Sequence, residues 1–112
     1  MRRATLWLGC ALAGMAAAAA AQAGSGAAPD GKALFHNRCA MCHDAHGMGT
    51  GLLARRMDPK VAELEKRTDL TPDYVIQAAR TGIGNMPPIS RGEVSDAEMG
   101  AIAAYLSKQK AP

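Results

Sequence analysis

Two cysteines and a histidine stand at the spacing with the clearest chemical use in this sequence. Cys39 and Cys42 lie three positions apart, and His43 follows the second cysteine directly. Two thiols at this spacing can each add to one vinyl group of a haem, and the adjacent histidine can then bind the iron from one side. The pattern therefore predicts a covalently attached haem, held by Cys39 and Cys42 and ligated by His43.

Three other uses of the same cysteines are open from the residues alone. A structural zinc site would need four ligands, so Cys39 and Cys42 would have to recruit histidines from among His36, His43 and His46. A thioredoxin-like dithiol would follow a strand and start a helix, whereas this motif is expected at a helix end. A plain disulfide would close a very short loop and would stabilise the fold little.

Met86 is the best candidate for the opposite side of the iron. It lies in a loop of glycines and prolines, 82–88, far enough beyond His43 for the chain to pass round the haem. Glycine lets the backbone approach closely and proline stiffens it. His46 or His36 is the alternative ligand. Histidine and methionine together would leave no open iron position and would raise the reduction potential. The sequence thus predicts an electron carrier without catalytic turnover of its own.

The first 23 residues have the pattern of an export signal. Arg2 and Arg3 precede an apolar run that ends near Ala21-Gln22-Ala23, which offers small residues for cleavage. A retained membrane anchor is the competing interpretation, but no basic residues follow the run to stop transfer. We therefore expect a signal peptide over 1–23, no stable membrane anchor after its cleavage, and a periplasmic protein.

Removal of the signal leaves a chain long enough for one compact domain. A flexible leader is expected over 24–29, followed by a single domain over 30–112. The shortened chain carries eleven Lys and Arg against ten Asp and Glu. Its near-neutral charge gives no reason to expect a nucleic-acid partner.

Helix start signals recur along this domain, and no stretch alternates apolar and polar residues convincingly. The start signals are Asp30, Pro59, Thr71-Pro72 and the capping box that begins at Ser95. The predicted helices cover 30–40, 59–67, 71–80 and 95–108. The last of them would place Met99, Ile102 and Leu106 on one face. The sequence therefore predicts an all-α fold, with irregular loops at 44–51 and 82–91.

Three segments of the chain resemble the small class I cytochromes c. They are Cys39-Ala40-Met41-Cys42-His43, Asn85-Met86-Pro87-Pro88 and Tyr105-Leu106, within a likeness that covers about 31–106. The resemblance implies the cytochrome c fold, in which about four helices wrap around one covalently bound haem c. It also implies that the first and last helices cross at Gly31, Phe35 and Tyr105.

The same resemblance assigns roles to residues that follow the motif. Members of the family often have Gly-Pro-x-Leu where this chain has Gly49-Thr50-Gly51-Leu52. The likeness implies that the Thr50 carbonyl accepts the ring proton of His43. It also implies that Leu52 and Leu53 pack on the haem. The pair Arg55-Arg56 could bind a haem propionate, or could simply be a solvated surface.

The spacing is also similar to the cytochrome subunits of flavoprotein dehydrogenases of the cresol and eugenol hydroxylase type. The segments in similar places are the glycine-rich loop, Tyr74-Val75, Met86-Pro87 and Tyr105-Leu106. That likeness implies a subunit that accepts electrons from a flavoprotein within a larger oxidoreductase. The alternative is a freely diffusing periplasmic shuttle between a donor and another cytochrome, a reductase or a terminal oxidase. The sequence leaves both roles open and identifies neither the donor nor the acceptor.

Overall fold

The computed structural model describes residues 26–108, and these form helices and connecting loops. The α-helices are α1 (Gly31–Arg38), α2 (Ala40–His43), α3 (Met48–Leu53), α4 (Pro72–Thr81) and α5 (Asp96–Leu106), with short 3₁₀ helices at Pro59–Val61 and Leu64–Lys66. Within this part of the chain there is no strand, only an isolated bridge between Ile83 and Met86. The expectation of an all-α fold is confirmed. The proposed signal peptide at 1–23 lies outside the described residues.

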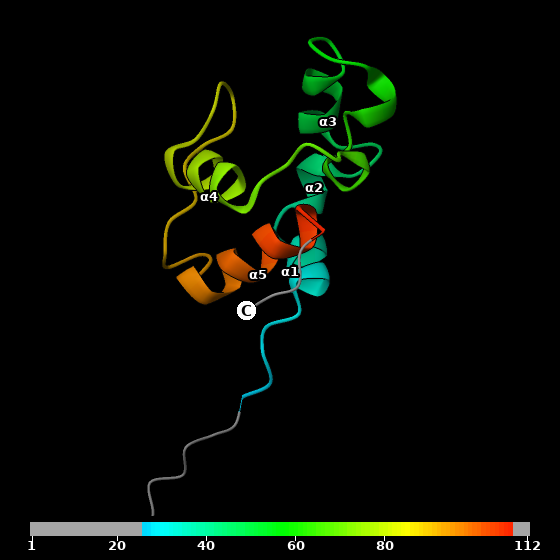
Figure 1. The fold of residues 1–112 in the computed structure, drawn as a ribbon. Coiled ribbons are helices and arrows are strands. Elements are labelled where there is room, and N and C mark those ends of the chain that lie inside the picture. The colour runs from blue at the N-terminus through cyan, green and yellow to red at the C-terminus, as the bar shows by residue number, and fades with distance from the viewer. Residues whose placement is uncertain (1–25, 109–112) are drawn as a thin grey trace, which may run out of the picture.

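Helices α1 and α5 cross closely, and a glycine allows that approach (Figure 1). A Cβ atom on Gly31 would lie 2.1 Å from the Ala101 carbonyl oxygen and 3.0 Å from the Tyr105 Cβ. Phe35 is fully buried beside the crossing, and its ring centroid is 6.0 Å from that of Tyr105. The predicted crossing at Gly31, Phe35 and Tyr105 is therefore confirmed.

The core lies between α5, α4 and α1. Met99, Ile102 and Leu106 are 2%, 1% and 2% exposed, so the predicted apolar face of the last helix is confirmed. Leu70 and Ala79 are also buried and belong to the same cluster. Burial of a large aliphatic side chain contributes roughly 1.5–3 kcal/mol, so each member of this cluster contributes appreciably to the stability of the fold.

The predicted starts of α1, α4 and α5 are confirmed by their caps. Asp30 accepts hydrogen bonds from the backbone N–H of Lys32, at 3.0 Å, and of Ala33. Thr71 caps α4 through the N–H of Tyr74, and Ser95 forms the complete capping box with Glu98. The helix ends differ from the prediction, because α1 stops at Arg38 and α5 at Leu106.

Two predicted segments are wrong. The stretch 44–51 contains the start of α3 rather than an irregular loop throughout, because its glycines serve close packing against the cysteine motif. The predicted helix at 59–67 is two 3₁₀ turns, since Glu63 is extended and separates them. Ala62 is the only buried residue of 59–67, so this segment has no apolar face that would hold a longer helix in place.

None of the helices described in residues 26–108 has both the length and the apolar character that a membrane span requires.

Candidate functional site

The cysteine motif lies at the junction of α1 and α2. The Cys39 N–H donates to the Phe35 carbonyl oxygen at 2.8 Å, which joins the motif to a fully buried residue. Cys39 then leaves the helical path, with φ −121°. Its carbonyl accepts from the N–H of Cys42 at 3.1 Å and of His43 at 3.0 Å. The buried end of α1 therefore fixes the single turn that carries the second cysteine and the histidine.

Helix α3 packs directly on this turn through two glycines. A Cβ on Gly47 would lie 2.3 Å from the Cys42 carbonyl oxygen. A Cβ on Gly49 would lie 2.7 Å from the same oxygen and 3.1 Å from Cε1 of His43. Only residues without side chains allow this approach. The same glycines that suggest a loop in the sequence therefore let α3 pack against the imidazole of His43.

The His43 ring is buried on its Nδ1 side. Nδ1 has no hydrogen-bond partner among residues 26–108. The predicted bond from this ring to the Thr50 carbonyl is therefore wrong; that carbonyl accepts from the Ala54 N–H at 2.9 Å. Burial lowers the pKa of His43, which favours the neutral imidazole that binds metals.

Met86 is presented by a loop that folds back over the end of α4. Gly82 has φ +74° and ψ 160°, a conformation that glycine adopts readily. A Cβ there would lie 2.6 Å from the Met86 carbonyl oxygen. Ile83 and Met86 exchange two backbone hydrogen bonds of 3.1 and 3.0 Å. These contacts hold Met86 in a half-buried position.

Two adjoining cavities bring the predicted site residues together. The larger, of about 350 Å³, is lined by Cys42, His43, Leu52 and Met86, among other residues. The smaller, of about 100 Å³, is lined by Cys39, again with His43 and Met86. Each predicted site residue thus borders at least one of the two cavities, and His43 and Met86 border both. Arg55 and Arg56 are exposed and also line the larger cavity.

The alternative ligands lie elsewhere. His36 and His46 are exposed and line neither cavity, and His36 lies 3.4 Å from a carboxylate oxygen of Glu65. Among residues 26–108, no three side chains of His, Cys, Asp or Glu come together as a metal site would require. The zinc alternative therefore has no ligand set in this part of the chain.

The structure also gives no support to a redox-active dithiol. The motif stands between two helices rather than after a strand. Burial, together with the neighbouring Cys42, raises the pKa of the Cys39 thiol. A reactive dithiol needs the opposite shift, because the thiolate is the nucleophile.

Comparison with known proteins decides the family. The model of the family described as cytochrome C oxidase, cbb3-type, subunit III, matches residues 26–106. The chain belongs to this family. It is also similar to cytochrome c6 of Synechocystis sp., with 32% identity over 79 residues, which are 70% of this chain and 62% of that protein. The chain thus spans less than two thirds of the length of this curated relative. No solved structure matches the chain significantly.

This cytochrome carries a class I monohaem domain, and its cofactor is haem c. The residues around the cavities fit that group in their chemistry. The two thiols that would hold the haem covalently border these cavities, and so do the imidazole of His43 and the thioether of Met86. Because Nδ1 of His43 is buried against α3, Nε2 is the ring nitrogen that would be available to bind iron.

Two cavity-lining residues carry no sequence signal that would have identified them. Tyr74 and Ile83 line both cavities and are 48% and 55% exposed. Tyr74 follows the predicted helix start at Thr71-Pro72, and Ile83 stands three residues before Met86. Only the folded arrangement places them at the rim of the site.

Proposed function

We propose that this cytochrome is a one-electron carrier whose single haem is bound covalently by Cys39 and Cys42 and ligated by His43 and Met86. The observation that carries the proposal is that the motif and the Met86 loop border the same cavities, although more than 40 residues separate them. When bound, the haem supplies an iron couple that exchanges one electron. Leu52 contributes to the apolar wall around it.

The two axial side chains determine what such a site can do. A thioether is a soft ligand that favours ferrous iron and therefore raises the reduction potential. An imidazole and a thioether bound to the iron would together leave no position for oxygen or a substrate. Both side chains are held by packed backbone, His43 by α3 and Met86 by the end of α4, so a change of redox state needs little rearrangement. We propose no catalytic turnover by this chain alone.

Replacement of Met86 by alanine tests the axial assignment. We expect Met86→Ala to lose the weak long-wavelength charge-transfer band of the ferric iron–sulphur bond and to lower the reduction potential. The matched control is Met48→Ala, because Met48 lines the same cavity but is 71% exposed on α3. It should retain both properties. A charge-transfer band that survives in Met86→Ala, or disappears in Met48→Ala, would contradict the assignment.

Export is part of the same proposal. We infer that residues 1–23 are a signal peptide and that the mature protein, a leader at 24–29 and a domain from 30 onward, works in the periplasm. Arg2, Arg3 and the run that ends near Ala23 support this. Intact mass of protein recovered from a periplasmic extract should correspond to a chain that begins at Gly24 and carries one haem. A chain that retains its first residues would contradict the cleavage.

The partners are redox proteins, either other cytochromes or oxidases. A diffusing shuttle is the first candidate, since the relative found in the comparison is named cytochrome c6 and not as a subunit of a complex. The near-neutral charge after cleavage offers no strong patch to steer encounters, and this favours a fixed partner instead. A fixed subunit is the second, since the family description names an oxidase subunit; a flavoprotein dehydrogenase is a further possible host. Gel filtration of a native extract separates the roles, because a shuttle elutes as a small monomer and a subunit with its complex.

A further inference from the structure

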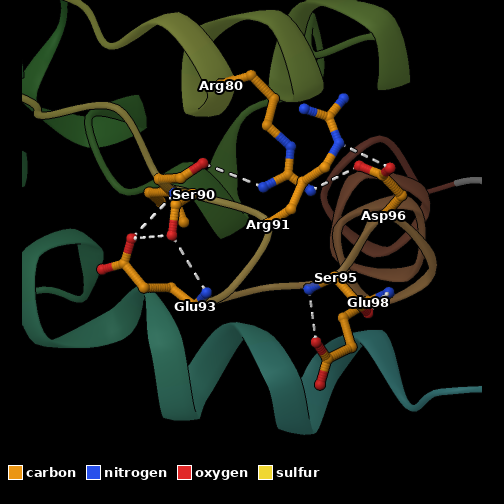
Figure 2. Close-up of polar contacts among 8 residues, drawn as sticks. Arg80, Ser90, Arg91, Glu93, Ser95, Asp96 and Glu98 are labelled. Carbon is orange, nitrogen blue, oxygen red and sulfur yellow. Dashed lines mark hydrogen bonds and ion pairs between the residues drawn. The ribbon is translucent and has the colours of Figure 1, made fainter.

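The Arg80 guanidinium lies where α4, the loop after Met86 and the start of α5 meet (Figure 2). Its Nη1 donates to the Ile89 carbonyl oxygen at 3.0 Å. Its Nη2 donates to Oδ1 of Asp96 at 2.9 Å. Arg80 thereby joins the last turns of α4 to a peptide three residues beyond Met86 and to the first residue of α5.

The peptide group of Ile89 is held to α4 from both sides. Its N–H donates to the Ala79 carbonyl oxygen at 2.8 Å, and its carbonyl accepts from Arg80. At the other end of the loop, Gly82 packs closely against the Met86 carbonyl oxygen. The chain between 82 and 89 is therefore fixed at both ends, and Met86 stands between these two points.

Arg80 differs from an ordinary surface arginine in its burial. Its side chain is 12% exposed, although its partner Asp96 is 67% exposed. Its Nε is buried without a hydrogen-bond partner among residues 26–108. Its guanidinium is thus largely enclosed by the protein and held on a carbonyl and a carboxylate, unlike the mobile head group of a surface arginine.

We infer that Arg80 is a positioning residue for Met86: by holding the Ile89 carbonyl and Asp96 together, it restrains the loop that keeps the methionine sulphur in place. This inference rests on the proposed function, in which Met86 is an axial ligand. The role belongs to the loop and not to the chemistry of the iron, since Arg80 lines neither cavity.

Arg91 provides a matched comparison. Its Nε donates to Oδ2 of Asp96 at 2.8 Å, so it pairs with the same carboxylate as Arg80. Its side chain is 73% exposed and it makes no hydrogen bond to Ile89 among the bonds of the described residues. Loss of Arg91 therefore removes a positive charge from Asp96 and leaves the restraint on the loop intact.

The experiment measures how fast Met86 leaves the ferric iron of the holoprotein. Imidazole is added at concentrations that saturate the rate, so that the absorbance change reports loop opening. We expect Arg80→Met to open about tenfold faster than wild type, as loss of a hydrogen bond from a charged donor implies. Arg91→Met should stay within roughly twofold, as expected for an exposed ion pair. Urea unfolding of each variant shows whether the effect exceeds global destabilisation.

Arg80→Lys tests the geometry of the guanidinium. Lysine keeps the charge but lacks the planar fork that reaches a carbonyl and a carboxylate at once, so its opening rate should lie between those of wild type and Arg80→Met. If Arg80→Met does not accumulate as holoprotein, Arg80→Lys alone must still open faster than wild type.

Two results would overturn the inference. One is an opening rate in the Arg80 variants equal to that of wild type. The other is an equal acceleration in Arg91→Met, which would assign the effect to Asp96. Failure of the proposed function would give a different result. Wild-type protein would then lack the iron–sulphur band before imidazole is added, which would contradict the axial role of Met86 and with it the role of Arg80.

Discussion

Gly47 and Gly49 determine how closely α3 approaches the cysteine motif. Neither glycine is needed for a turn. Both are needed because a side chain at either position would collide with the Cys42 carbonyl oxygen. The motif itself predicts the cysteines and His43 from the sequence. The support for the imidazole could not be predicted in the same way, because it depends on which backbone atoms meet after folding.

Alanine at Gly49 should therefore displace α3 from His43. The added Cβ would lie 2.7 Å from the Cys42 carbonyl oxygen, and we expect destabilisation on the order of 1–3 kcal/mol, measured by urea unfolding of the holoprotein. The control is Gly51→Ala in the same helix, where nothing lies within 4 Å. That change should stabilise by about 1 kcal/mol, because alanine favours helix over glycine. Equal destabilisation by both changes would contradict the packing role.

The elements of this fold are predictable where their ends carry local signals. Asp30, Thr71 and Ser95 cap helices as the sequence predicts. Helix α3 was not predictable, because two of its six residues are glycines and its support comes from α2. The hydrogen bonds of Arg80 could not be predicted from the sequence either, since its partners lie 9 and 16 residues away in the chain.

A tyrosine joins α5 to the segment before α4, and this contact should depend on pH. The Tyr105 hydroxyl donates to Glu65, and the Lys108 ammonium donates to the Glu65 carbonyl oxygen at 2.7 Å. Burial, together with the hydrogen bond to Glu65 and the charge of that carboxylate, raises the pKa of Tyr105 to about 12. The hydroxyl is thus protonated in the folded state at pH values where an unfolded tyrosine ionises.

The sign of the pH dependence follows from that raised pKa. Because the unfolded pKa is about 10, the contribution of Tyr105 to stability is complete below pH 10 or so and is lost as pH rises through about 12. In urea unfolding, the stability difference between wild type and Tyr105→Phe should stay constant at neutral pH and shrink above pH 10 or thereabouts. A difference that does not change across this range would contradict the contact.

At the scale of the whole molecule, the described domain has few large side chains with which to build a core. The largest fully buried ones are Phe35, Met99, Ile102 and Val94. The cavities lie beside this cluster, and Met99, Ile102 and Leu106 line the smaller one. Haem would therefore extend the apolar core as well as provide the redox centre. The shortage of aromatic residues in the sequence already indicates such a need, whereas the shape of the space does not follow from composition.

Covalent attachment through Cys39 and Cys42 is the claim on which the site depends. The direct measurement is acid–acetone extraction, followed by a pyridine haemochrome spectrum of the precipitated protein. Wild-type chain and a Cys39→Ala, Cys42→Ala double variant are both matured in a host that attaches c-type haem. Wild type should keep its haem through extraction, and the double variant should release or lack it. Haem extracted from wild type, or retained by the double variant, would contradict the attachment.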